Sequence, residues 1–381
     1  MSNKQEKAHR LLMDYARRTG IVEGEGGITQ RYLGTDAFAV QGFFALAHIY
    51  DNKEYEKLAV RLIDAVHGVL GKFHKEDSRK GWISGLSESE GKEHPTVGGL
   101  RIGKEMPERG QDEPFNSRLE WDRDGQYFHY ITRWIHSLLL AERETDNRQY
   151  AIQALELLKA CEKFIDRSKG LRMYWKMSTD LSRPLVSASG AHDPLEGLIC
   201  AESILDVLPE KEKELGQMLD DLNKLCHGQE WSTADALGTG SLLLNTLQAS
   251  ALTLSGRKLN ESIQPKKLFQ ECLYGLGYFM HSEEVKSAPF GRLAFRECGL
   301  SLGLRAIFAL KDRVGEVGIS LKKIERYMVL ADEIENSWLD EKNQRHGSWK
   351  DHLDINAVTL ACSIIAQNHP YVFCPVKVTV G

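Results

Sequence analysis

The chain has 381 residues, of which 42% are hydrophobic and 27% are charged, and these fractions are typical of a globular protein with a large core. The formal net charge is −5 and no long basic run occurs, which argues against a nucleic-acid partner because phosphate binding requires a clustered basic face. No stretch of about 18 consecutive apolar residues is present, so we expect no membrane partner and no membrane-spanning helix.

The seven cysteines are widely scattered, and none forms a C-x-x-C pair. Most lie among apolar residues of predicted helices, where a free thiol behaves as a small hydrophobic side chain. Residues 1–18 are charged throughout and lack the apolar stretch of a secretory signal peptide. We therefore predict a reduced, cytoplasmic protein, with a secreted protein that carries a free thiol as the alternative.

Two kinds of helix alternate along the chain. The first kind is apolar on one face only, with one mixed segment at 266–280, and is predicted at residues 3–18, 54–73, 149–165, 211–225, 266–280 and 321–338. The second kind is apolar nearly all round, which indicates burial on every side. These helices begin near residues 35, 124, 192, 237, 295 and 353.

A long segment, residues 74–118, interrupts this alternation. It is charged and rich in glycine and proline, and it leads into an acidic sequence, so that the insertion extends over about 74–123. A loop of this length inside a compact protein is either functional or disordered. We predict a lid or a wall of a substrate site rather than a disordered segment.

About twelve alternating helices have a simple packing solution, which is six hairpins arranged as two concentric rings. We therefore predict an all-α fold, an (α/α)6 toroid, as one domain over residues 1–381. Antiparallel alternation would place the N-termini of the inner helices at one end, and small residues such as Gly299 and Gly303 would allow close approach. The alternative is an open solenoid of helical pairs, which would leave its terminal repeats unpaired.

This architecture resembles the six-hairpin (α/α)6 toroid superfamily, which includes many glycoside hydrolases and the N-acylglucosamine 2-epimerase-like sugar isomerases. The resemblance covers the whole chain, and it depends on the alternation of helices and on segments such as RLEWDRDGQYFHY (118–130) and GAHDPLEG (190–197). It implies a pocket for a small carbohydrate at the N-terminal ends of the inner helices. It does not specify the reaction, because one fold supports many activities.

Carboxylates are the candidate catalytic groups for sugar hydrolysis, which requires one protonated and one ionised carboxyl group roughly 5–10 Å apart. Asp124 is the leading candidate, because Glu120 and Asp122 precede it and three acids so close together repel unless something binds them. The second carboxylate would be Glu297 or Asp193. The alternative for an acid at a helix start is capping, which we weigh most heavily for Asp36, Asp193 and Asp354.

The candidate substrate-binding residues are polar or aromatic side chains near the predicted inner-helix N-termini. They are Asp36, Trp82, Trp121, Asp122, Tyr127, His129, Trp175, His192, Arg296, Trp349, His352 and Asp354. Core packing is the alternative for each aromatic residue, and a hydrogen-bonded core position is the alternative for His129. Arg296 and Glu297 form either an internal ion pair or an acid with its neighbouring cation.

Glycoside hydrolysis of a short or modified sugar is the leading functional hypothesis. Epimerisation is the first alternative, because histidine suits proton abstraction next to a carbonyl and two histidines would then face a pocket for an open-chain sugar. A noncatalytic sugar-binding or scaffold protein is the second. The calcium, zinc and phosphate-loop motifs are absent, so we expect no metal and no cofactor. The oligomeric state is left open.

Overall fold

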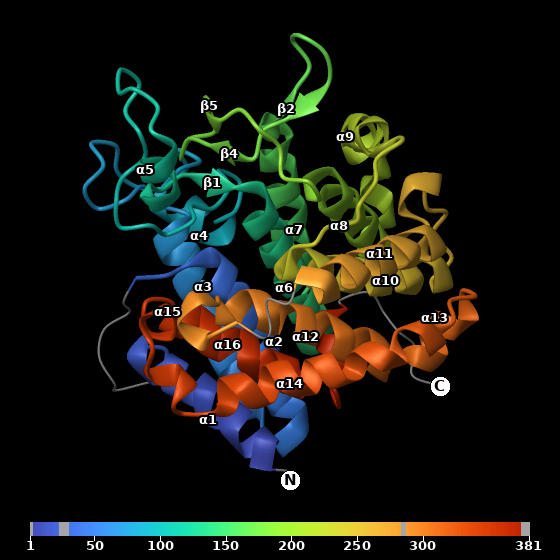
Figure 1. Ribbon diagram of the computed structural model, residues 1–381. Helices are drawn as coiled ribbons and strands as arrows, with labels where there is room; N and C mark the ends of the chain where they lie inside the picture. The colour runs from blue at the N-terminus through green and yellow to red at the C-terminus, as the bar shows by residue number, and fades with distance from the viewer. Residues whose placement is uncertain (1–2, 23–29, 283–286, 375–381) are drawn as a thin grey trace. The chain divides into compact units, whose positions relative to one another are not determined.

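Helices make up most of the computed structural model, which describes residues 3–22, 30–282 and 287–374 (Figure 1). The helices with one buried face are α1 (Asn3–Arg18), α3 (Lys53–Leu70), α7 (Gln149–Ala160), α9 (Glu212–Cys226), α11 (Pro265–Ser282) and α14 (Met328–Leu339). The helices buried nearly all round are α2 (Leu33–Tyr50), α6 (Phe128–Thr145), α8 (Asp193–Val207), α10 (Ala236–Leu254), α12 (Ala294–Ala309) and α16 (Leu353–Ala366). The predicted alternation of the two kinds is confirmed.

The shorter elements lie between these helices. They are α4 (Glu88–Glu93), α5 (Ser117–Asp122), α13 (Lys311–Glu316), α15 (Gly347–Lys350), β1 (Gln126–Tyr127), β2 (Ile165–Asp166), β3 (Arg172–Met173), β4 (Lys176–Met177) and β5 (Pro184–Val186). Strands β1, β4 and β5 form an antiparallel sheet in the order β1-β4-β5, and β2 pairs with β3. No helix among the described residues has the length and apolar character that crossing a membrane requires.

Two boundaries differ from the sequence-based prediction. Helix α6 begins at Phe128 rather than near Asp124, because Gly125 has a positive φ of 142° and the next two residues pair with β4. Within the predicted helix 321–338, the α-helix begins only at Met328. Two short 3₁₀ helices, Leu321–Lys323 and Glu325–Tyr327, replace the first part of the prediction.

The chain divides into two compact units. Unit 1 comprises residues 1–18, 41–57 and 228–381, and unit 2 comprises residues 19–40 and 58–227. Helices α2 and α3 each begin in one unit and end in the other. The assignment of the whole chain to one domain stays a prediction.

In unit 1, the buried helices α10, α12 and α16 pack in sequence, and α11, α14 and α1 cover them. Helices α10 and α12 approach very closely, since a Cβ atom added to Gly240 would lie 2.2 Å from the carbonyl oxygen of Gly299. A Cβ atom at Gly303 would lie 2.5 Å from the carbonyl oxygen of Gly240. The small residues therefore serve close helix packing, as predicted for Gly299 and Gly303.

In unit 2, α6 packs against α7 and α8, and α8 packs against α9. The first half of α2 lies beside α6, where the Ser137 hydroxyl donates a hydrogen bond of 2.9 Å to the carbonyl oxygen of Ala37. Helix α3 reaches α6 through a 3.1 Å hydrogen bond from the Trp134 indole to His67. All seven cysteines are free and buried, as the sequence pattern predicts.

Candidate functional site

The N-terminal ends of three buried helices meet in unit 2. Tyr32, just before α2, and Tyr130, in the first turn of α6, share a hydrogen bond of 2.9 Å between their hydroxyls. Thr132 of α6 donates a 2.9 Å hydrogen bond to Glu196 in the first turn of α8. The predicted convergence of helix N-termini is therefore present within this unit for α2, α6 and α8.

The inserted segment supplies one wall of this region. The amide of Ile102 donates to the carbonyl oxygen of Gly125 at 2.8 Å, and the amide of Leu33 donates to the carbonyl oxygen of Ile102 at 3.0 Å. These bonds tie residues 99–106 between the start of α2 and strand β1. As a result Lys104 lies over the ring of Tyr32, with its ammonium nitrogen 5.3 Å from the ring centre.

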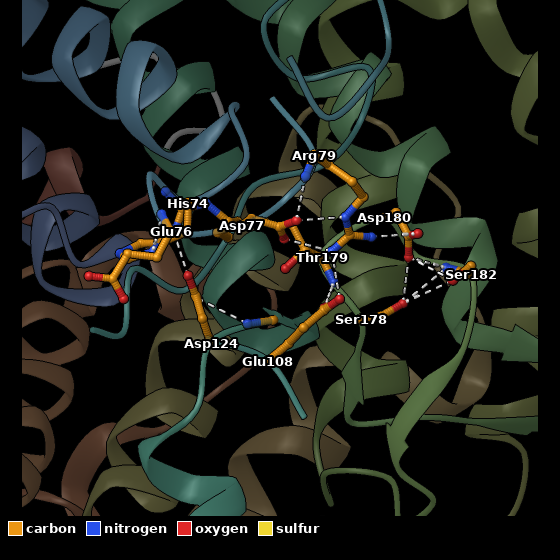
Figure 2. A network of polar contacts seen from close by, with 12 residues as sticks. His74, Glu76, Asp77, Arg79, Glu108, Asp124, Ser178, Thr179, Asp180 and Ser182 are labelled. Carbon is orange, nitrogen blue, oxygen red and sulfur yellow. Dashed lines mark hydrogen bonds and ion pairs between the residues drawn. The ribbon is translucent and has the colours of Figure 1, made fainter. Parts of the chain in front are cut away.

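A charged network fastens the rest of the insertion to the β4–β5 hairpin (Figure 2). The Arg79 guanidinium contacts Asp77 at 2.8 Å, Glu108 at 2.7 Å and Asp180 at 2.8 Å. Glu108 also accepts a hydrogen bond from the backbone amide of Thr179. The insertion is ordered in this structure, contrary to the disordered alternative, and its role as a lid or a wall of a substrate site stays a prediction.

Three nearby acids, Glu120, Asp122 and Asp124, have different surroundings. Glu120 is buried between Arg109, at 3.0 Å, and Lys176, at 3.1 Å. Asp122 is exposed, and it has no ion pair among the residues that the structure describes. Repulsion within the acidic triplet is thus relieved by cations from the insertion and from β4, and Asp122 is the carboxylate left facing solvent.

Asp124 is buried, with 1% of its surface exposed, and both of its oxygens are bonded. One oxygen accepts from the guanidinium of Arg101. The other accepts from the amides of Gly103 and Gly125, each at 3.0 Å. These partners hold the insertion against β1, so the geometry favours a structural role, and catalysis by Asp124 stays a prediction.

Asp193 is the first residue of α8, and its side chain is buried. It does not cap the helix, because the N-cap position is His192, and it accepts instead from the amide of Gly190 at 2.9 Å. Burial, together with the nearby charge of Glu196, raises the pKa of Asp193 to about 8. Its carboxyl group is therefore mostly protonated at neutral pH, and its catalytic role stays a prediction.

Glu196 lies one turn further along α8 and is buried. Burial by itself would raise the pKa of Glu196, but Arg133 at 2.5 Å, together with His129 and His192, outweighs burial and keeps that pKa below its usual value. A buried carboxylate thus lies among two histidines and an arginine. Glu196 is not among the candidate residues of the sequence analysis, although it lies in the segment GAHDPLEG (190–197).

His129 and His192 are both partly exposed, at the first turn of α6 and at the N-cap of α8. Burial lowers the pKa of His129 to about 4, and Arg133 adds to this effect while Glu196 opposes it. The His129 imidazole is consequently neutral at pH 7. The structure brings these two predicted residues to the same carboxylate.

Aromatic rings lead from the surface to His129. Trp121, 56% exposed, meets Trp175 edge-on with 4.6 Å between ring centres. Trp175 stacks on Tyr127 at 4.9 Å, and Tyr127 stacks on His129 at 5.8 Å. Four predicted substrate-binding residues therefore form one continuous aromatic wall in unit 2. The exposed ring of this wall, Trp121, suits the apolar face of a sugar.

Two other predicted residues of unit 2, Trp82 and Asp36, are buried and form hydrogen bonds within the protein. Trp82 is buried, its indole donates to Glu88 at 3.1 Å, and a Cβ atom at Gly91 would lie 2.3 Å from its ring. It packs inside the insertion and offers no platform. Asp36 is buried 3.7 Å from Arg31 and accepts from the amide of residue 32 at 3.2 Å, in keeping with the capping alternative.

In unit 1, Glu297 is buried between Arg292, which bonds both of its oxygens at 2.7 and 2.5 Å, and the indole of Trp338 at 2.7 Å. Arg296 bonds Asp235 at 3.0 Å instead of Glu297. The alternative of an internal Arg296–Glu297 ion pair is therefore wrong, because consecutive helix residues point in different directions. Catalysis by Glu297 stays a prediction, and its geometry favours a structural role.

The remaining predicted residues also lie in unit 1. Trp349 is buried and stacks on Trp338 at 5.8 Å, so it offers no open platform. His352 is exposed and lies 5.7 Å from the ring of Phe295. Asp354 forms a 2.7 Å ion pair with Arg18 of α1. Substrate binding by these residues stays a prediction.

The site contains groups that sequence reasoning missed, namely Tyr32, Lys104 and Tyr130. Tyr130 lies in the aromatic run after the acidic triplet, which was a usable signal, whereas nothing local distinguishes Lys104. Among residues 3–22, 30–282 and 287–374, no group of three or more His, Cys, Asp or Glu side chains is arranged to hold a metal ion.

Comparison with known proteins identifies structures with a similar fold. No protein-family model matches the sequence, and no curated protein matches it either. Among solved structures, the GH76 α-mannanase of Bacteroides thetaiotaomicron is 8% identical, with a TM-score of 0.55 over 97% of this chain and 96% of that chain. A sugar epimerase from a ruminal bacterium is 10% identical, with a TM-score of 0.52 over 96% and 99% of the two chains.

A third similar structure is an α-1,6-mannanase, GH76A, of Salegentibacter sp. HEL1_6, in complex with α-1,6-mannotriose. It is 10% identical, with a TM-score of 0.54 over 97% of this chain and 100% of that chain, and it is an inactive variant with two consecutive aspartates replaced by asparagine. The chain has an (α/α)6 toroid fold, as these solved structures do. The predicted fold class is confirmed, and likeness at this identity establishes the fold alone.

Proposed function

We propose that this protein is a carbohydrate-active enzyme that epimerises a sugar by proton transfer at the carbon next to its carbonyl group. The observation that carries the proposal is the contrast between histidines and carboxylates at the site in unit 2. His129 and His192 are partly exposed, whereas Asp124, Asp193 and Glu196 are buried. The fold, shared with mannanases and a sugar epimerase, supports a carbohydrate substrate.

The proposed roles follow from the state of each side chain. His129 is neutral at pH 7, which is the state that removes a proton from carbon. His192, on the neighbouring helix, would return a proton to the other face. Glu196 would position both imidazoles and favour their charged forms during proton transfer, while Trp121 and Asp122 would bind the sugar.

Solvent exchange tests this reaction directly. Wild-type protein is incubated with reducing mono- and disaccharides in D₂O, and NMR follows both deuterium at C2 and the appearance of an epimer. We expect exchange with at least one sugar, and a rate at least roughly 100-fold lower in His129→Asn, the usual contribution of a general base. The control is His227→Asn, an exposed histidine at the end of α9.

Hydrolysis is the second candidate, and the similarity to α-mannanases over nearly the whole chain favours it. The only consecutive aspartates in this sequence are Asp220 and Asp221 of α9, and Asp221 is buried and bonded by Arg167 at 2.7 Å. Cleavage of α-1,6-mannooligosaccharides without solvent exchange into any reducing sugar would replace epimerisation with hydrolysis. Absence of both reactions would leave a binding or scaffold role.

A further inference from the structure

Three tyrosines, Tyr32, Tyr127 and Tyr130, gather beside His129. Tyr32 and Tyr130 bond one another at 2.9 Å, and the ring of Tyr127 lies 5.4 Å from that of Tyr130. Only one hydroxyl proton is used in the bond between Tyr32 and Tyr130. The cluster therefore retains donors for a further acceptor.

Tyr127 is the distinctive member. It is 3% exposed, yet its hydroxyl has no hydrogen-bond partner among the residues that the structure describes. A buried hydroxyl without a partner costs about 1–3 kcal/mol, so such a group calls for a ligand. Burial raises the pKa of Tyr127 above its ordinary value, and the hydroxyl is therefore a neutral donor at physiological pH.

A cation lies on the other side of the cluster. Lys104 is half-buried over the ring of Tyr32 and has no carboxylate within ion-pair distance in the described part of the chain. Burial lowers the pKa of Lys104, although Asp122 and Asp124 oppose this effect. An ammonium group and an unbonded phenol thus belong to one cluster of contacting aromatic rings, which also includes the proposed base.

We propose that Tyr127, assisted by Lys104, forms an oxyanion-binding subsite for the carbonyl oxygen of an open-chain sugar, so that the substrates are sugars with a free reducing end. The inference rests on the proposed function, since it requires a proton-transfer reaction at His129. It deepens that function by naming the class of substrate and the group that stabilises its intermediate.

The step balances without an oxidant or a reductant. His129 removes the hydrogen at C2 as a proton, the electrons of the C–H bond form a C1=C2 double bond, and the carbonyl π electrons move to O1. The Tyr127 hydroxyl donates a hydrogen bond to the resulting oxyanion, and the charge of Lys104 stabilises it. When His192 delivers a proton to the opposite face of C2, the C1=O bond reforms and the product is the epimer.

Removal of the hydroxyl tests the subsite. Tyr127→Phe should lower kcat for exchange at C2 about 100-fold or more while KM changes little, because an oxyanion donor acts mainly in the transition state. Its melting temperature should not fall, since the variant removes an unpartnered group. Tyr174→Phe is the matched control, because that hydroxyl bonds Asp166 at 2.7 Å on the β2–β3 hairpin.

Lys104→Met and Lys104→Arg provide a second route that keeps all three hydroxyls. We expect a loss of kcat of about 10-fold in the methionine variant and recovery in the arginine variant. A methyl glycoside of the best aldose, whose ring cannot open, should undergo neither exchange nor cleavage. Comparable turnover of the methyl glycoside would overturn the reducing-end assignment.

The two proposals fail in different ways. Absence of exchange in wild-type protein with every reducing sugar refutes the proposed function itself. Exchange in wild type that persists within about threefold in Tyr127→Phe refutes the oxyanion subsite and leaves the epimerase proposal intact. A rise in KM alone also refutes it, because the hydroxyl would then bind the ground state and the transition state equally.

Discussion

The two units use the same helix design with different outcomes at the helix N-termini. In unit 1, polar groups at the starts of α10 and α12 are paired with one another: Arg296 pairs with Asp235, and Glu297 pairs with Arg292. In unit 2, the corresponding ends of α2, α6 and α8 leave His129, His192, Tyr32 and Tyr130 partly exposed.

The difference comes from the connections and not from the helices. In unit 2, residues 71–127 and 161–192 separate consecutive long helices, and their cations take up Glu120 and Asp124. In unit 1 the connections before α10 and α12 are much shorter. Side chains at the inner-helix N-termini thus stay partly exposed where inserted segments, instead of neighbouring helix residues, provide their surroundings.

The largest expected effect is at the buried ion pair of the insertion. Arg101→Met leaves the buried carboxylate of Asp124 without its cation, and loss of one partner of such a pair costs about 3–5 kcal/mol. Urea unfolding measures the free energy of unfolding. Asp124→Asn should likewise lose stability while each folded molecule keeps its activity, and a stable but inactive Asp124→Asn protein would instead make Asp124 the catalytic carboxylate.

The next effect concerns acid stability. Burial lowers the pKa of His67 and of His136 to about 3, with Arg133 adding to the shift at His136, whereas the unfolded chain binds a proton near pH 6.5. Below pH 6.5 the unfolded state therefore binds more protons than the native state. The contribution of these two histidines to the free energy of unfolding is fully present above pH 6.5. As the pH falls below 6.5, the free energy of unfolding decreases by up to about 1.4 kcal/mol per pH unit for each histidine.

Chemical unfolding between pH 7 and pH 4.5 measures this dependence. His136→Phe should reduce the slope by about one proton, since it removes one of the two groups. An unchanged slope would mean that His136 is already solvated in the native protein. An exposed histidine of unit 1, replaced in His352→Phe, is the matched control and should leave the slope as it is.

A smaller effect is expected behind the tyrosine cluster. A Cβ atom at Gly34 would lie 3.1 Å from the ring of Tyr130, so Gly34→Ala should displace that ring at a cost of about 1 kcal/mol and reduce turnover several-fold. Gly68→Ala is the control, because a Cβ atom there meets no neighbour within 4 Å. That variant should be slightly more stable, since alanine favours a helix. Equal activity and stability in both variants would show that Tyr130 tolerates displacement.

The smallest effect is at the surface of unit 1. Arg18 and Asp354 form a partly exposed ion pair at 2.7 Å, and such pairs contribute less than about 1 kcal/mol. Asp354→Asn should therefore change the melting temperature by no more than a few degrees. A loss of stability as large as that in Arg101→Met would contradict the distinction between this exposed ion pair of unit 1 and the buried ion pair of unit 2.

The architecture could be predicted from the sequence alone. Helices with one apolar face alternate with helices apolar all round, and this pattern located α10, α12 and α16 to within a residue or so of their observed starts. Burial imposes that periodicity directly on the residues, so the pattern is readable along the chain. The aromatic wall was also predictable in part, because Trp121, Tyr127 and His129 are close together in sequence.

Which polar residues stay exposed and unpaired depends on the tertiary structure and could not be predicted from the sequence. Asp124 and Asp122 are two positions apart and chemically equivalent, yet one is buried against Arg101 and the other faces solvent. Tyr32 and Lys104 joined the site through hydrogen bonds between segments distant in the chain. Partners of this kind are set by packing across the fold, and no local pattern records them, because an ion pair or a hydrogen bond depends on distance in space.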